Sequence, residues 1–203
     1  MNELYAAVIH DVKNQLAELA LRLGERADAQ QEMSIAMSAA RRLSEMLLVA
    51  RQESELLSVN PDSVDTADFL SIMAAEYQEL FPALKFEIDT SGAPAFAFFD
   101  DALVRLALSN ALHNACRSAR TRVRLAARER DGMLALEVAD DGPGYPETML
   151  ENKGDTPAAA SNSGTGLGLY LARKIAELHK LEGRSGRIEL VNDGGAVFRM
   201  FLP

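Results

Sequence analysis

Apolar residues in the first 58 positions recur with the spacing of α-helices. One stripe advances in steps of three or four residues, through Leu4, Val8, Val12, Leu16, Leu19 and Leu23. A glycine-containing turn over 23–30 follows, and a second stripe between Met33 and Leu57 alternates steps of three and four. Steps of this size keep apolar side chains on one helix face, so the pattern predicts a helical hairpin over residues 1–58.

A hairpin of two amphipathic helices cannot bury both apolar stripes within itself. We expect two copies of the chain to pair, so that their hairpins form a four-helix bundle in a homodimer. The pattern leaves open the alternative that the hairpin packs against the rest of its own chain.

The pattern changes after SVNPDSV (Ser58–Val64), where proline, asparagine and aspartate together indicate a boundary between domains. We therefore place one domain at residues 1–58 and a second at 59–203. Helices are expected over 67–81, from Asp100 or Asp101 to about 119, and after the glycine-rich stretch that begins at 161. Strands are expected over 84–90 and 95–99, in a hairpin over 122–142 that turns at Asp131-Gly132, and over 186–192 and 196–203.

These elements predict an α+β fold in which helices cover one face of a mixed sheet. The least regular stretch, residues 145–163, is small, polar and rich in turn formers, so we expect a mobile loop there.

Charge and composition narrow the function classes. With 21 lysines and arginines against 30 aspartates and glutamates, the formal net charge is −9. DNA binding needs a basic face, so we expect no nucleic-acid partner, and any phosphate must be bound locally. The lone cysteine, Cys116, cannot form an internal disulfide, and the chain has neither an apolar run of membrane length nor a secretion signal. We expect a cytoplasmic protein.

Three alternate glycines stand where a helix begins. Gly164, Gly166 and Gly168 alternate with Thr165 and Leu167. Glycine lets a ligand approach the backbone closely, and a helix N-terminus presents free N–H groups, so the stretch is a candidate phosphate site. A flexible hinge is the alternative.

Asp140 ends the alternating strand LALEVAD and falls on its apolar face. A carboxylate at the edge of a core needs a hydrogen-bond donor, and the amino group of an adenine would be one. We expect Gly142 and Gly144 to leave room for a flat base. An ordinary exposed Asp-Gly turn is the alternative.

Asn110, Asn114 and Arg117 fall on one stripe of the helix that precedes this strand. Amide oxygens can ligate a hydrated Mg²⁺, and an arginine can contact a phosphate. The alternative is a polar face in contact with solvent.

In this order and spacing, the features resemble the ATP-binding domain shared by histidine kinases, DNA gyrase and the related chaperone ATPases, the GHKL or Bergerat type. NALHNACR is similar to the asparagine box of that family, DDGPG to its first glycine box and GTGLGLYLARKIAELH to its second. The terminal GRIEL…GGAVFRMFLP is similar to its closing hairpin. The resemblance covers about residues 60–203 and implies an α/β sandwich that binds ATP and Mg²⁺ beneath a mobile lid, residues 145–163.

The resemblance also implies roles for single residues. Asn114 is the Mg²⁺ ligand, and Asp140 holds the adenine amino group. The remaining residues of the implied nucleotide site are Asn110, Arg117, Gly142, Gly144, Gly164, Thr165, Gly166, Leu167 and Gly168, of which the glycines at 164, 166 and 168 shape the end of the lid and the phosphate site.

Two places in the sequence indicate which group accepts the phosphoryl group. Gyrase-type ATPases carry a glutamate that activates water where this chain has Asn110, and asparagine cannot act as a base. The helical stretch IHDVKNQL offers a nucleophile, because neutral imidazole is a good one near pH 7 and His10 is flanked by Asp11 and, one turn on, Asn14. On the residues alone, a surface His–Asp pair is the alternative.

This stretch resembles the phosphoacceptor box of sensor histidine kinases, so the whole chain resembles a histidine kinase core. The resemblance implies that His10 is phosphorylated, that Asp11 assists the transfer and that Asn14 places a water when the protein dephosphorylates its partner. The phosphoryl group would pass to an aspartate of a response-regulator receiver domain. The signal would come from a separate sensor protein or from a sensor domain missing from this chain.

Two other functions fit the same architecture. One is a non-enzymatic histidine phosphotransfer relay protein, against which the intact Asp140 and glycine boxes argue. The other is an anti-sigma-like serine kinase of the GHKL type, which would need neither the hairpin with His10 nor an asparagine at position 110.

Overall fold

The computed structural model describes residues 58–152 and 167–203 throughout, together with ten separate positions before residue 58, all of them helical. The chain divides into two compact units, Met1–Ser58 and Val59–Pro203. In the described parts of the chain, no helix combines the length and the apolar character that crossing a membrane requires.

Several predicted features lie outside the described residues. The N-terminal hairpin does so except for those ten helical positions. The predicted site residues concerned are His10, Asp11, Asn14, Gly164, Thr165 and Gly166.

A five-stranded mixed sheet forms the centre of the second unit. Its strand order is β2-β4-β5-β9-β8, with β2 and β4 parallel and the other neighbours antiparallel. The strands are β2 (Lys85–Gly92), β4 (Arg122–Arg130), β5 (Met133–Asp140), β8 (Arg187–Asn192) and β9 (Ala196–Leu202). The predicted turn between β4 and β5 is confirmed, because Asp131 and Gly132 both have positive φ, 54° and 69°.

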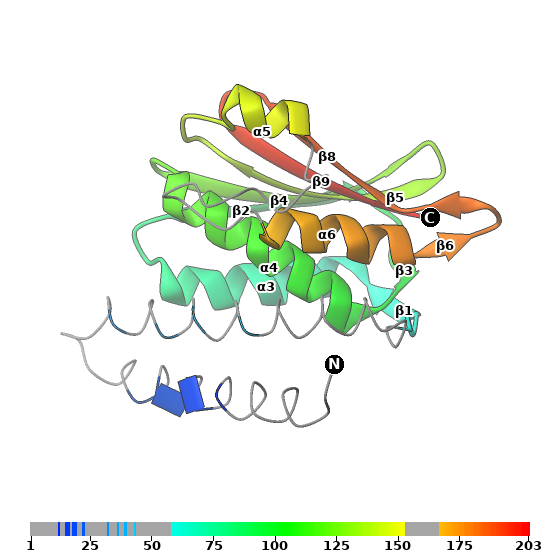
Figure 1. The fold of residues 1–203 in the computed structure, drawn as a ribbon, viewed down its shortest axis with the longest axis horizontal. Helices are drawn as coiled ribbons and strands as arrows, with labels where there is room; N and C mark the ends of the chain where they lie inside the picture. Colours follow the sequence, from blue (N-terminus) through cyan, green and yellow to red (C-terminus); the bar gives the residue numbers. More distant parts are fainter. Residues whose placement is uncertain are drawn as a thin grey trace. The chain divides into compact units, whose positions relative to one another are not determined.

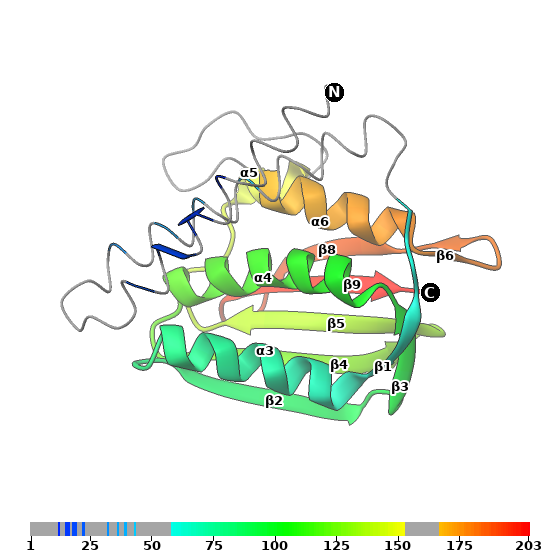
Figure 2. The same ribbon diagram turned by 90° about the horizontal axis from the view of Figure 1, so that it is seen from below.

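Three long helices cover one face of this sheet, as Figures 1 and 2 show for α3 (Thr66–Leu80), α4 (Asp101–Ser118) and α6 (Leu167–Leu178). Aspartates cap the first two of these helices. Asp65 accepts bonds from two amides in the first turn of α3, and Asp100 accepts one from the first turn of α4. The mixed sheet with helices on one face, predicted from the alternation of patterns, is confirmed.

The inner face of the sheet forms the core with these helices. On β5, Leu134, Leu136 and Val138 alternate onto that face and are buried. Leu108 and Leu112 of α4 and Leu171 and Ile175 of α6 are buried as well. The sheet therefore fixes the position of Asp140, which ends β5 on the face that the helices cover.

The outer face of the sheet carries ion pairs between strands instead of helices. Arg199 of β9 donates to Glu137 of β5 at 2.7 Å and to Glu189 of β8 at 3.2 Å. At one end of this face, the guanidinium of Arg187 lies 4.0 Å from the centre of the Phe201 ring. Charged and arginine-capped positions let this face meet water without a helical cover.

The segment before α3 forms an additional strand that the sequence pattern did not predict. β1 (Asp62–Asp65) pairs antiparallel with β3 (Phe96–Phe99), and the two make a separate sheet. Residues 58–64 were expected only to mark a boundary. Because β1 is short and mostly polar, it has no alternation that would distinguish it from a turn.

Two further elements differ from the sequence-based expectation. Within the expected loop 145–163, residues Glu147–Asn152 form a short helix, α5, whose first turn is closed by bonds from Met149 and Leu150 to the carbonyl of Pro146. Between α6 and β8, β6 (Lys180–Leu181) and β7 (Arg184–Ser185) form a small hairpin. In Figures 1 and 2 this hairpin projects at the end of the sheet opposite to α5.

Candidate functional site

Asp140 lies at the end of β5 on the helix-covered face of the sheet, as its register predicts, and is only 9% exposed. Its Oδ1 accepts a hydrogen bond from the Gly142 amide at 2.7 Å and a longer one from the Ala196 amide at 3.4 Å. Among the described residues, no hydrogen bond reaches Oδ2. A buried carboxylate with one oxygen left over can accept a bond from a ligand.

The Asp140 carboxylate contributes to a raised pKa at two neighbouring side chains. Burial raises the pKa of the Cys116 thiol to about 12, and the nearby Asp140 carboxylate adds to the rise. Burial, followed by the same carboxylate, also raises the pKa of the Tyr145 hydroxyl. Cys116 and Tyr145 therefore remain neutral beside the carboxylate, and Cys116 is a buried thiol with little tendency to react.

The two glycines after Asp140 stand where other parts of the protein approach the backbone closely, and the expectation that they also leave room for a base stays a prediction. A Cβ on Gly142 would stand 2.3 Å from the carbonyl oxygen of Ser118, the last residue of α4. Gly144 has φ +86°, and a Cβ there would stand 2.7 Å from the side chain of Asn192. Because these two positions have no side chain, the end of α4 can lie against Gly142 and Asn192 can lie against Gly144.

Asn192, which ends β8, holds the start of the segment after the glycines. Its Oδ1 accepts a bond from the Tyr145 amide at 2.7 Å, and its Nδ2 donates to the Tyr145 carbonyl at 3.0 Å. The two bonds fix the backbone of one residue to the sheet. They connect positions 47 apart in the chain, and the sequence pattern gave no signal for them.

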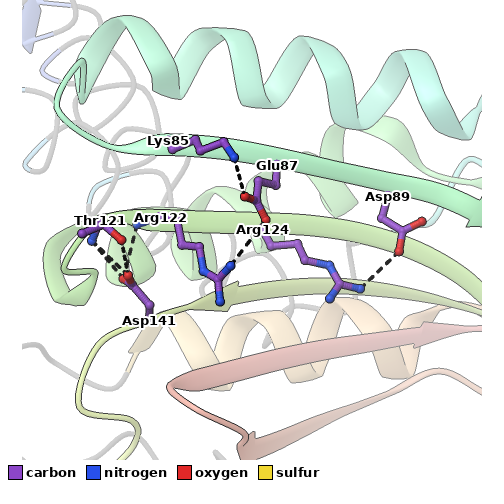
Figure 3. A network of polar contacts seen from close by, with 7 residues as sticks. All are labelled: Lys85, Glu87, Asp89, Thr121, Arg122, Arg124 and Asp141. Atoms are coloured by element: carbon purple, nitrogen blue, oxygen red, sulfur yellow. Dashed lines mark hydrogen bonds and ion pairs between the residues drawn. The ribbon is translucent and has the colours of Figure 1, made fainter.

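Asp141, directly before Gly142, is bonded to the start of β4, as Figure 3 shows for Thr121 and Arg122. Its carboxylate accepts bonds from the amides of Arg120, Thr121 and Arg122 and, at 2.5 Å, from the Thr121 hydroxyl. These bonds, that of the Thr121 hydroxyl above all, hold the pKa of Asp141 well below its usual range. The chain next to Asp140 is therefore fastened to the start of β4.

Asn110 on α4 is buried, with 6% of its surface exposed. The alternative of a polar face in contact with solvent therefore does not hold for this residue. Its Nδ2 has no hydrogen-bond partner among the described residues. A Cβ on Gly168 would stand 3.3 Å from the Cβ and Cγ of Asn110, so glycine lets the first turn of α6 pack against this side chain. A buried amide group without a partner is costly, and a water or a ligand would relieve that cost.

Asn114 and Arg117 follow Asn110 on α4 and are exposed. They can therefore reach a ligand that lies over the C-terminal half of α4. The described residues contain no group of three or more His, Cys, Asp or Glu side chains that could hold a metal ion. The Asn114 amide oxygen fits Mg²⁺, which keeps most of its waters and takes few protein ligands when it binds together with phosphates.

Comparison with known proteins gives matches along the whole chain. A family model described as histidine kinase-, DNA gyrase B-, and HSP90-like ATPase matches residues 99–203. Sensor protein kinase PilS of Pseudomonas aeruginosa is 27% identical over 217 residues, which cover 98% of this chain and 40% of PilS. Sensor histidine kinase GtrS of the same species is 29% identical and covers 99% of this chain, which spans 41% of GtrS. The chain thus spans less than half the length of these relatives.

A solved structure shares the fold. Full-length ShkA, determined in complex with AMPPNP, has a TM-score of 0.68 at 22% identity, with 100% of this chain and 46% of that chain covered. At such identity the likeness establishes the architecture alone.

Proposed function

The chain belongs to the histidine kinase-, DNA gyrase B- and HSP90-like ATPase family, and we propose that it is the core of a sensor histidine kinase. In this proposal it transfers the γ-phosphoryl group of ATP to His10 and then to an aspartate of a response-regulator receiver domain. The homology to sensor kinases extends over the N-terminal unit as well, since PilS matches 98% of the chain.

The observation that carries the proposal is the Asp140 Oδ2, which no hydrogen bond from the described residues reaches. Its partner oxygen Oδ1 is already bonded to the Gly142 amide, so the carboxylate is held in one orientation. The 6-amino group of adenine is a donor that this oxygen would accept from. Specific recognition follows, because a base with an oxygen at that position would place an acceptor against a buried carboxylate.

The phosphate end of the nucleotide would lie toward Asn114, Arg117 and the glycine segment that leads into α6. A helix N-terminus presents amide groups and the positive end of the helix dipole, so the start of α6 is where we place the phosphates. Mg²⁺, held by the Asn114 amide oxygen, would neutralise negative charge on the phosphates. Arg117 is exposed on the same helix and would contact a phosphate oxygen.

Asn110 favours phosphoryl transfer to the protein over hydrolysis, because an amide cannot take a proton from water. In the proposed step a ring nitrogen of His10 bonds to the γ-phosphorus, the bond between that phosphorus and the oxygen bridging to the β-phosphate breaks, and ADP leaves. Asp11 receives the proton that the imidazole loses. Asn14, one helical turn from His10, would place the water that dephosphorylates the receiver domain.

The proposal includes a particular assembly. We propose that the hairpins of two chains form a four-helix bundle, that the protein is cytoplasmic, and that a separate sensor protein or a further domain delivers the signal. The presence of Asp140 and of the glycine boxes in the sequence supports an enzyme over a relay protein, which would need no nucleotide.

The test is to incubate the full chain with ATP labelled at the γ-phosphate and to measure the acid stability of the bound label. We expect acid-labile label on the wild type and none on His10→Gln, with nucleotide binding retained. His113→Gln is the matched control and should label normally. Label that survives acid, or that persists on His10→Gln, would reject His10 as the acceptor.

A further inference from the structure

A buried histidine joins the far end of α6 to the start of α4. His179 is 4% exposed, and its Nε2 accepts a hydrogen bond from the backbone amide of Asp100 at 3.1 Å. Since Nε2 accepts, the proton lies on Nδ1, which donates to the Ile175 carbonyl at 2.8 Å. Both ring nitrogens are thus used, one toward each helix.

Asp100 makes two more bonds at the same place. Its Oδ1 accepts from the Leu103 amide at 3.0 Å and caps α4, while its Oδ2 accepts from the Asn60 amide, also at 3.0 Å. Asn60 is the second residue of the unit Val59–Pro203 and belongs to the segment through which the N-terminal unit is attached. One aspartate therefore connects that segment, the start of α4 and, through His179, the end of α6.

The other end of α6 lies at the proposed nucleotide site. There Gly168 lies against Asn110 of α4, so closely that a Cβ on Gly168 would stand 3.3 Å from the Asn110 side chain. Between the two ends, Leu171 and Ile175 are almost fully buried. Helix α6 is thus fixed to α4 at both of its ends, and a displacement at His179 would be carried along the helix to its first turn.

We propose that Asp100 and His179 are positioning residues for the nucleotide site, and that the bond from Asn60 makes the position of α6 depend on the segment that joins the two units. This inference rests on the proposed function. Neither residue touches the nucleotide in it: His179 sets where α6 begins relative to Asn110, and Asp100 ties that setting to the attachment of the N-terminal unit.

The chemistry of the junction is specific. An apolar side chain at position 179 would leave the Asp100 amide without its acceptor in a buried place, which costs free energy. Asparagine would keep a donor near the position of Nδ1 but has no atom at the position of Nε2. Glutamine reaches the position of Nε2 with its amide oxygen, so it can restore the bond from Asp100.

The first test compares His179→Asn, His179→Gln and the control His113→Asn in the full chain. His113 lies on α4, and the centre of its ring is 6.1 Å from the centre of the Phe81 ring. We expect His179→Asn to weaken ATP binding about tenfold and to speed amide hydrogen exchange at Leu169–Leu171, with His179→Gln closer to wild type. The control should lose thermal stability without either change.

The second test compares Asp100→Ser with Asp65→Ser. Serine caps a helix nearly as well as aspartate, but it is too short to keep both the cap and the bond from Asn60. Asp65 caps α3 through the Ala67 and Asp68 amides and is bonded to neither Asn60 nor His179, so it is the matched control. We expect Asp100→Ser to change the rate of self-phosphorylation about fivefold or more, at an ATP affinity within about twofold of wild type.

The outcomes separate this inference from the proposed function. If the wild type binds no ATP, the proposed function fails, while hydrogen exchange at the first turn of α6 still decides the positioning role of His179. Equal exchange in His179→Asn and His113→Asn would reject that role. A phosphorylation rate in Asp100→Ser equal to that of Asp65→Ser would reject the coupling through Asn60.

Discussion

Gly195 lies so close to Asp140 that a Cβ on Gly195 would stand 1.9 Å from the Asp140 carbonyl oxygen. The turn between β8 and β9 is thereby held against the end of β5, where the Asp140 side chain begins. We expect Gly195→Ala to cost about 3 kcal/mol or more, because backbone atoms cannot move aside as a side-chain tip can. Thermal unfolding should show a Tm lower by roughly 10 °C.

The neighbouring glycine provides the control for this prediction. Gly194 has φ +68° and no atom within 4 Å of its built Cβ. Asparagine tolerates positive φ, so Gly194→Asn should lower Tm by only a few degrees, about a third of the effect at Gly195 or less. Equal losses at the two positions would mean that the close approach to Asp140 is not what requires Gly195.

Asn192 should control the segment that follows the first glycine box. Asn192→Ala removes both of its bonds to the Tyr145 backbone, and we expect a loss of about 1–2 kcal/mol in urea unfolding. Hydrogen exchange should quicken at the amides of 145–150 and change little elsewhere. Asp193→Ala, at the next position, which is also exposed, should leave both measurements as in the wild type. Similar changes there would contradict a specific role of Asn192.

Asp141 should make stability depend on acid pH. Its pKa is lowered in the folded protein, so its contribution is present in full above the pKa of an unfolded aspartate and is lost as the pH falls through the folded pKa. The Tm difference between wild type and Asp141→Asn should therefore be constant above about pH 5 and shrink below about pH 4. Asp193→Asn is the charge-matched control and should show no such window. A difference that grew on acidification would contradict the bonding described for Asp141.

The Cys116 thiol should be unreactive while the protein is folded. Its pKa of about 12 leaves almost no thiolate at pH 8, and the side chain is buried. Iodoacetamide should modify it only as fast as the fold opens, and labelling should accelerate across the urea transition. Asp140→Asn should remain slow, because burial is the larger cause of the raised pKa. Labelling in native buffer at the rate of a free cysteine would show that this part of α4 is not closed.

The sequence predicted those features that depend on local periodicity. The face of Asp140 follows from the alternation of Leu136 and Val138, and the turn of the β4–β5 hairpin from Asp131-Gly132. The β6–β7 hairpin was missed because two-residue strands have no period, and its turn places Glu182 at φ 50°, where glycine or asparagine would have been the usual signal. Short elements held by tertiary contacts leave no pattern to detect.

The hydrogen bonds that hold the backbone around the site could not be predicted from local patterns, for a related reason. Asn192 and Tyr145 are far apart in the sequence, and so are Asp141 and Thr121, whose contact forms only once the sheet has brought β4 and β5 together. That Gly142 and Gly144 leave room for a base stays a prediction, and no sequence pattern indicated the atoms that exclude a side chain there, which belong to Ser118 and Asn192. Glycines can be recognised in a motif before the atoms that require them are known.

The most direct measurement of the central claim compares the affinities of ATP and inosine triphosphate, which carries an oxygen in place of the adenine amino group. If Oδ2 of Asp140 accepts from that amino group, the wild type should prefer ATP by about 30-fold or more. In Asp140→Asn the amide oxygen would keep the bond from Gly142 and turn an NH₂ group toward the base, so the preference should vanish or reverse. Equal affinities for the two nucleotides in the wild type, or a preference for ATP that survives in Asp140→Asn, would contradict the assignment of this site.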